Sequence, residues 1–358
     1  MEPPAPRRPR LRELGLRLGA LEPGPANAIS DVPGVAVGHM TVWRDEPDPP
    51  DCRGIARTGV TAIVPGKGGA VLDPPLAAGV ALLNGAGELT GSLQISEWGL
   101  VETPIYLSST MAVGRVFDGA VAAACDADPS VGVDRIVIPV VGECDDSWLN
   151  DARTVQVEAE DAGRAVDAAA DGPVDEGCVG AGAGMVALDW KAGIGTSSRL
   201  LPTTGATLGV LALANFGSAA DLRVAGIPMG DALGSGVDAP PPPAGSCIAV
   251  VVTDAPLGSH NLERVARRCG LGLARTGSVA HHGSGEIFLA VSTAPKRVHV
   301  RADALDEVFA ATVDATEEAV LNALWAAADT VGREGRVVKA LPHDAVLELL
   351  ERHGLRHR

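Results

Sequence analysis

The strongest constraint on the fold of this chain is a Gly-Ser junction between a proline run and a β-branched apolar run. Four prolines at 240–243 come shortly before Gly245 and Ser246, and residues 247–253 read CIAVVVT. Prolines interrupt regular elements, whereas β-branched residues favour buried strands, so we expect a strand over Ile248–Thr253. The pattern places the serine at the start of a buried strand, directly after a flexible glycine.

A hydroxyl at this junction indicates a specific chemistry. The Ser246 hydroxyl can attack the carbonyl carbon of Gly245, and hydrolysis of the resulting ester leaves Ser246 as a new N-terminus. The new α-amine has a reference pKa of about 7.7–8.0, so part of it is neutral at pH 7 and can act as base for its own hydroxyl. One cut thus supplies both nucleophile and base. The structural alternative is an inert loop-to-strand junction.

The rest of the chain predicts a mixed α/β fold. Further buried strands are indicated by short β-branched runs at Gly59–Pro65, Arg135–Val141, Ala206–Ala214 and Glu286–Ser292. Helices are indicated by apolar residues three and four apart at Trp148–Ala170, Asn261–Leu271, Ala302–Leu324 and Asp344–His353. Residues 1–25 are rich in proline and arginine and lack the apolar segment of a signal peptide, so we expect a flexible lead that packs little.

Charge and cysteine usage exclude several classes of function. The net charge is −16, from 29 basic and 45 acidic residues, which disfavours nucleic acid and anionic membranes as partners. Six cysteines show neither a C-x-x-C pair nor metal-site spacing, which argues against a disulfide framework and a metal centre. These features favour a reduced protein in the cytoplasm that binds neither nucleic acid nor membrane.

Three other patterns have structural interpretations. Gly180, Gly182 and Gly184 alternate as in some phosphate loops, but the dinucleotide fingerprint needs a different spacing, so we interpret them as tight backbone packing. The adjacent histidines 281 and 282 point apart in an extended segment, which disfavours joint metal binding. Cys247 lies one step along the strand from the candidate serine, on the opposite face, and is interpreted as a core residue.

Blocks of sequence spread over most of the chain resemble the DmpA and β-aminopeptidyl peptidase family. Besides the Gly-Ser junction, they include DVPGVAVGH (31–39), VVGECDDSWLND (140–151), GVLALANFG (209–217), HHGSGEIFLAVSTA (281–294) and EEAVLNALWAAADTVGREGRVVKALP (317–342). The resemblance implies a four-layer α/β/β/α sandwich, like the Ntn hydrolases but with different strand connectivity. It also implies one catalytic domain over residues 26–358, cleaved into 1–245 and 246–358, and a homotetramer of processed heterodimers without metal or organic cofactor.

The same resemblance implies the site residues. Ser284 and Glu286 match the family's Ser-x-Glu pattern, in which the serine would bind the Ser246 hydroxyl and the glutamate would orient it and balance the α-ammonium charge. Asn215 in LANFG matches the oxyanion-hole asparagine. Glu143 in VVGEC matches an acid near the substrate's free amino group.

One departure concerns the substrate pocket. The chain continues Cys144-Asp145-Asp146 where DmpA has a tyrosine near its active site. This difference leaves the pocket assignment open and does not affect the nucleophile.

These observations predict a self-processing aminopeptidase or amidase. It would hydrolyse the amide or ester bond after a small N-terminal residue through an acyl-enzyme on Ser246. The alternatives are a related acyltransferase or a specialised amide hydrolase with a pantetheine-type substrate, and an unprocessed binding protein without catalysis. The joint presence of the Gly-Ser junction, the Ser-x-Glu pair and Asn215 argues against a silent protein.

Overall fold

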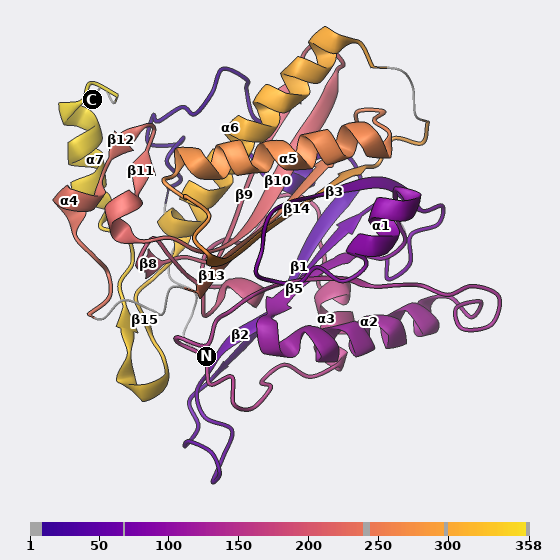
Figure 1. Ribbon diagram of the computed structural model, residues 1–358, viewed down its shortest axis with the longest axis horizontal. Helices are drawn as coiled ribbons and strands as arrows, with labels where there is room; N and C mark the ends of the chain where they lie inside the picture. Colours follow the sequence, from indigo (N-terminus) through magenta and orange to yellow (C-terminus); the bar gives the residue numbers. More distant parts are fainter. Residues whose placement is uncertain (1–8, 67–68, 239–243, 297–299, 356–358) are drawn as a thin grey trace.

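Two sheets lie between two layers of helices in the computed structural model, which describes residues 9–66, 69–238, 244–296 and 300–355 (Figure 1). Helices α5 and α6 pack on the larger sheet, and α2 and α3 pack on the smaller one. The sheets face each other through β6 and β13. The layer order is therefore α/β/β/α, and the predicted four-layer sandwich is confirmed.

The strands of the smaller sheet lie in the order β1 (Val35–Arg44), β2 (Ala56–Pro65), β5 (Ile105–Ser109) and β6 (Val140–Cys144). Those of the larger sheet lie in the order β4 (Leu100–Val101), β3 (Leu76–Gly85), β14 (Gly283–Ser292), β13 (Ala244–Thr253), β10 (Ala206–Asn215) and β9 (Ile194–Leu201). Strand β13 pairs parallel with β14 and antiparallel with β10. The Gly-Ser junction therefore lies in the interior of the larger sheet.

The α-helices are α1 (Ser92–Trp98), α2 (Val113–Ala127), α3 (Glu160–Asp167), α4 (Gly230–Leu233), α5 (Ser259–Arg275), α6 (Ala302–Ala326) and α7 (His343–Arg352). Two-stranded sheets join β7 (Val186–Ala187) to β8 (Trp190–Lys191), β11 (Arg223–Val224) to β12 (Ile227–Pro228) and β15 (Thr330–Val331) to β16 (Val337–Val338). Five single turns of 3-10 helix are described: η1 (Ile29–Asp31), η2 (Thr110–Ala112), η3 (Gly180–Gly182), η4 (Ala219–Asp221) and η5 (Arg333–Gly335). Among the described residues, no helix is long and apolar enough to cross a membrane.

Strand β13 is buried on both faces because it lies between two cores. Ile248 and Val250 pack in the core between the sheets, whereas Cys247 and Ala249 pack in the core under α5 and α6. This is the alternation of a strand, in which residues two apart share a face. Ser246 therefore belongs to the face of Ile248, and Cys247 is a core residue, as predicted.

Two predicted elements are wrong in part. The strand expected at Arg135–Val141 begins only at Val140, because Pro139 precedes it and the side chains of Ile136 and Ile138 are exposed instead of packed. The helix expected at Trp148–Ala170 is confined to α3. Residues 148–159 form turns and irregular segments, and the Asp161 side chain accepts a hydrogen bond from the Glu158 main-chain N–H at 2.9 Å just before the helix.

The N-terminal lead is not loose over residues 9–25, so this expectation is wrong there; residues 1–8 lie outside the described residues. Leu11 and Leu16 are buried in the core under α6. Arg12 forms an ion pair with Glu318 of α6 at 3.0 Å, and the Trp325 indole donates to the Pro9 carbonyl at 2.7 Å. Arg10 and Arg12, two of the arginines that suggested a solvated lead, are instead partners of Glu176 and Glu318, whose carboxylates are largely buried.

Candidate active site

Gly245 and Ser246 lie near the start of β13, between the ends of two neighbouring strands. Ser246 is paired in register with Asn215 of β10 on one side and with Gly285 of β14 on the other, and it is buried. A Cβ atom at Gly245 would lie 2.7 Å from the Asn215 carbonyl oxygen and 2.9 Å from the Phe216 Cα. The close approach of β10 explains why this position holds glycine.

The Asn215 side chain is held at both ends by main-chain groups. Its Oδ1 accepts a hydrogen bond from the Val186 N–H at 2.9 Å, and its Nδ2 donates to the Asp145 carbonyl at 2.8 Å. An N–H can only donate and a carbonyl can only accept, so these two partners fix which end of the amide is nitrogen. One Nδ2 hydrogen remains for another acceptor beside Ser246.

Ser284 and Glu286 form a buried pair on β14. The Ser284 hydroxyl donates to Glu286 Oε1, whereas Glu286 Oε2 is buried without a hydrogen-bond partner. Burial raises the pKa of the Glu286 carboxyl, because desolvation disfavours the charged form. This carboxyl group therefore has an unused acceptor in a position shielded from water.

In the uncleaved chain, the Ser284–Glu286 pair is not yet hydrogen-bonded to the proposed nucleophile. Glu286 is paired in register with Cys247, and alternation places Ser284 and Glu286 on the Cys247 face of the sheet. Among the described residues, no hydrogen bond links Ser246 to either of them. The expected hydrogen bond between Ser284 and Ser246 is therefore not formed in this part of the structure while residue 246 is held inside the strand.

Glu143, at the end of β6, is anchored beside the same strand ends. Its Oε1 accepts a hydrogen bond from the Glu88 N–H at 2.9 Å, and its Oε2 accepts one from the Thr110 hydroxyl. A Cβ atom at Gly87 would lie 2.9 Å from Glu143 Oε1 and 3.5 Å from the Cα of Gly285. Burial is the main cause of a raised pKa for Glu143, and the nearby carboxylates of Asp145 and Glu88 add to it.

Sequence reasoning missed the main-chain groups that orient Asn215 and Glu143. The Asp145 carbonyl, the Val186 N–H and the Glu88 N–H have no side-chain signature, because every residue except proline offers both groups. Asp145 lies in the Cys144-Asp145-Asp146 stretch, where the chain departs from the tyrosine-containing pattern. Its Oδ1 accepts a hydrogen bond from the Ser147 N–H at 2.9 Å, and its main-chain carbonyl is the group that bonds Asn215.

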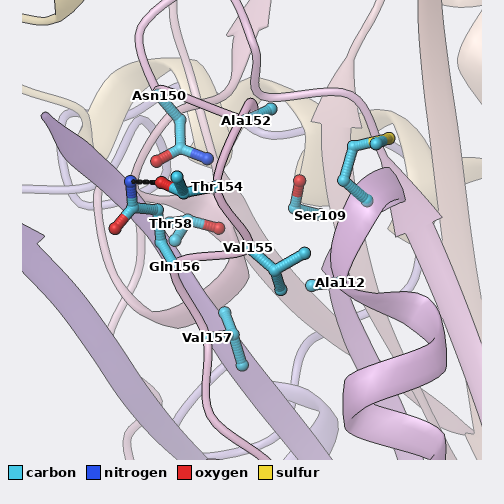
Figure 2. Close-up of a pocket in the computed structure, with 10 residues that line it drawn as sticks. Thr58, Ser109, Ala112, Asn150, Ala152, Thr154, Val155, Gln156 and Val157 are labelled. Carbon is cyan, nitrogen blue, oxygen red and sulfur yellow. Dashed lines mark hydrogen bonds between the residues drawn. The ribbon is translucent and has the colours of Figure 1, made fainter. Parts of the chain in front are cut away.

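A small cavity lies between β2, the end of β5 and the segment 150–157 (Figure 2). Its polar lining includes Thr58, Ser109 and Asn150. The last two donate hydrogen bonds to Asp146 Oδ1, at 2.8 and 3.0 Å. No predicted site residue lines the cavity, and no cluster of three or more potential metal ligands occurs among the described residues.

Comparisons with known proteins agree on one family. The family model of Peptidase family S58 matches residues 27–338. A beta-peptidyl aminopeptidase, BapA, of Sphingosinicella microcystinivorans is 38% identical over 376 residues, which cover 96% of this chain and 92% of the relative.

Two solved structures extend this likeness to the fold. An L-aminopeptidase D-Ala-esterase/amidase from Ochrobactrum anthropi, described as a prototype for the serine aminopeptidases and a variant of the Ntn hydrolase fold, superposes with a TM-score of 0.89. It is 37% identical, and the alignment covers 98% of this chain and 100% of that one. A beta-aminopeptidase from Burkholderia sp. superposes with a TM-score of 0.88 at 40% identity and the same coverage.

Proposed function

This chain belongs to peptidase family S58, and from that premise we propose that Ser246 becomes the nucleophile of a serine aminopeptidase by self-cleavage of the Gly245–Ser246 bond. The observation that carries the proposal is the register of three strand ends, which brings Asn215, Ser246 and the Ser284-Glu286 strand to neighbouring positions. Family membership favours this hydrolase over the acyltransferase and binding-protein alternatives.

Maturation forms one ester and breaks one amide. The Ser246 Oγ attacks the Gly245 carbonyl carbon, the C–N bond breaks, and the nitrogen becomes a free α-amine. Water then hydrolyses the ester, which releases the Gly245 carboxylate and restores the hydroxyl. The amine takes the hydroxyl proton in later turnovers, when the same oxygen attacks the substrate.

The unpartnered oxygen of Glu286 supports this scheme. A buried carboxylate without a cation or a full set of donors is costly. Cleavage creates an ammonium group at residue 246, next to Cys247, which is the register partner of Glu286. It also frees the new terminus to turn toward the side chains of β14. Ser284 and Glu286 then orient the amine and the hydroxyl, which the intact strand holds apart.

Asn215 supplies the oxyanion hole in this proposal. Its free Nδ2 hydrogen is preorganised by the contacts with Val186 and Asp145. A side-chain amide donor of this kind lowers the barrier by about 2.7–4 kcal/mol, because it acts where charge develops in the transition state.

The amino group of the substrate binds at Glu143. A buried carboxylate at this position gains a charge-assisted hydrogen bond from a substrate ammonium and offers nothing to a blocked N-terminus. The relatives named as aminopeptidases support a substrate with a free N-terminus. We propose a small N-terminal residue joined by an amide or ester bond.

The mature protein is proposed to be a homotetramer of processed heterodimers in the cytoplasm. Six free thiols, three of them buried, fit a reducing compartment.

A comparison of blocked and free substrates tests the aminopeptidase activity. Fully cleaved protein should hydrolyse amino-acid p-nitroanilides with a free amine and should not hydrolyse the N-acetylated compounds. Glu143→Gln should raise KM for the free substrates. Equal turnover of blocked and free substrates would refute the role of Glu143.

A further inference from the structure

The loop that contains β7 and β8 holds Asn215 from one side. Besides the Val186 contact with Asn215 Oδ1, Leu188 N–H donates to the Phe216 carbonyl at 2.6 Å, and the Ala214 N–H donates to the Gly193 carbonyl at 3.0 Å. The loop thus bonds the residue before Asn215, its side chain and the residue after it. Its conformation sets the position of the amide.

A buried ammonium group lies at the centre of this loop. Lys191 has no exposed surface, and its Nζ donates to the carbonyls of Gly182, Met185 and Ala192 at 3.2, 2.9 and 2.6 Å. Met185 directly precedes Val186, and Lys191 is also the register partner of Val186 in the β7–β8 pair. The ammonium therefore joins the two ends of the loop immediately beside the N–H that binds Asn215.

The turn that bonds the other end of the Asn215 amide packs on the same loop. Asp146, next to the Asp145 carbonyl, has no exposed surface. A Cβ atom at Gly184 would lie 2.9 Å from the Asp146 Cβ, so the glycine lets the loop and the turn touch. Desolvation lowers the pKa of Lys191, and the neighbouring Cys178 and, to a smaller extent, Asp146 act against this lowering.

We propose that Lys191 is a positioning residue for the oxyanion hole, which fixes the Val186 N–H and through it the Asn215 amide. This inference rests on the proposed role of Asn215. Three carbonyls converge on one cation. Without the Lys191 donor, the Ala192 carbonyl would lose its partner and the Gly182 and Met185 carbonyls would keep only a main-chain N–H, so the loop would relax and the amide would shift. A misplacement of about 1 Å at a reacting centre can reduce the rate about 10²-fold.

A double-mutant cycle on cleaved protein tests the inference. Lys191→Met should reduce kcat by about 10-fold to 10²-fold with an unchanged KM for p-nitroanilides, because the amide acts only in the transition state. In an Asn215→Ala background, the same substitution should reduce kcat no further, because the amide it positions is gone. The same loss of kcat in both backgrounds, or a normal kcat for Lys191→Met, would overturn the inference.

Arg199→Met provides the matched control. Arg199 is another fully buried cation that donates to main-chain carbonyls, those of Ser198 and Leu18 at 2.6 and 2.8 Å, but it pairs with Leu208 at the other end of β10. The Arg199→Met substitution should lower the melting temperature and leave kcat per cleaved molecule unchanged. An equal fall in kcat for Arg199→Met would show that the removal of either buried cation lowers kcat only because it destabilises the protein. This result would refute the specific role of Lys191.

Two further readouts keep the test decisive. If Lys191→Met does not accumulate as folded protein, Lys191→Gln keeps a nitrogen donor on a shorter side chain, and it should show a smaller fall in kcat with the same dependence on Asn215. If Asn215→Ala alone leaves kcat unchanged, Asn215 is not the oxyanion donor, and the proposed function loses that residue together with the role of Lys191. A fall for Asn215→Ala combined with a normal Lys191→Gln contradicts only the positioning role.

Discussion

Individual hydrogen-bond donors and acceptors decide the chemistry at the start of β13. Asn215→Ala should lower kcat by about 10² to 10³ with little change in KM, because its donor acts on the developing oxyanion. Self-cleavage passes through a similar tetrahedral intermediate and should also slow. Steady-state kinetics on cleaved protein and a time course of cleavage measure the two effects. A normal kcat would exclude Asn215 from the oxyanion hole.

Glu286 and Ser284 should affect activation of the nucleophile more than substrate binding. In protein that is already cleaved, Glu286→Gln and Ser284→Ala should reduce kcat while KM stays close to normal. The restriction to cleaved protein separates catalysis from maturation. If cleaved Glu286→Gln protein works at the normal rate, its buried oxygen is a structural feature of β14.

Asp146 gives a prediction about pH and stability. Burial raises its pKa from 3.8 to about 7, so the folded protein binds this proton more tightly than the unfolded chain does. The free energy of unfolding should therefore decrease as the pH rises from 3.8 to about 7, because Asp146 ionises in the unfolded chain before it does in the folded protein. Urea titrations of Asp146→Asn should show a smaller decrease over the same window. Parallel curves for the two proteins would contradict the raised pKa.

Most of the site side chains were predictable from the sequence, whereas the groups that orient them were not. The Gly-Ser junction itself indicates the chemistry of Ser246, whereas the roles of Ser284 and Asn215 are those that the family resemblance implies, and all three stay predictions. The Asp145 carbonyl and the Val186 N–H come from main-chain atoms of distant segments. Only the fold brings those segments together, so no pattern of residue types indicates them.

At the scale of elements, the start of β13 depends on close contact with β10. Gly245→Ala would place a methyl group 2.7 Å from the Asn215 carbonyl oxygen, so the strand start should shift and self-cleavage should slow. Gly114→Ala is the matched control, because a Cβ atom there meets nothing within 4 Å. Cleavage at the same rate in both variants would show that the geometry at residue 245 does not control maturation.

Strands and helices with a strong apolar period were predicted well, whereas the helix expected before α3 was not. β13, β14 and α6 follow runs that are buried on most sides. The region before α3 has helical spacing, but the Asp151 and Asp161 side chains bond main-chain N–H groups there and favour turns. Whether such side-chain hydrogen bonds replace a helix depends on the tertiary surroundings of the segment, which the spacing of apolar residues does not indicate.

For the whole molecule, the N-terminal segment joins the two predicted fragments. Residues 9–27 contact α6, which would belong to the 246–358 fragment, through Arg12, Asn27 and the Pro9 carbonyl. Glu318 is nearly fully buried and also pairs with Arg199 at 2.7 Å, so removal of its partners is costly. The proline and arginine content of this segment did not indicate such packing.

Deletion of residues 1–25 should therefore destabilise the protein and loosen the fragments. We expect a lower melting temperature and, in cleaved protein, separation of the fragments at a lower urea concentration on size-exclusion chromatography. Arg17→Ala serves as the control, because Arg17 lies in the same segment and its ion pair with Glu22 is exposed. An unchanged melting temperature after the longer deletion would contradict a structural role for this segment.

Intact mass spectrometry tests the central claim most directly. After incubation at neutral pH, active wild-type protein should contain two species, one ending at Gly245 and one beginning at Ser246, and Ser246→Ala should stay whole and inactive. Ser246→Thr keeps a hydroxyl and should cleave slowly. A single uncut species with full aminopeptidase activity would contradict a nucleophile generated by cleavage between Gly245 and Ser246.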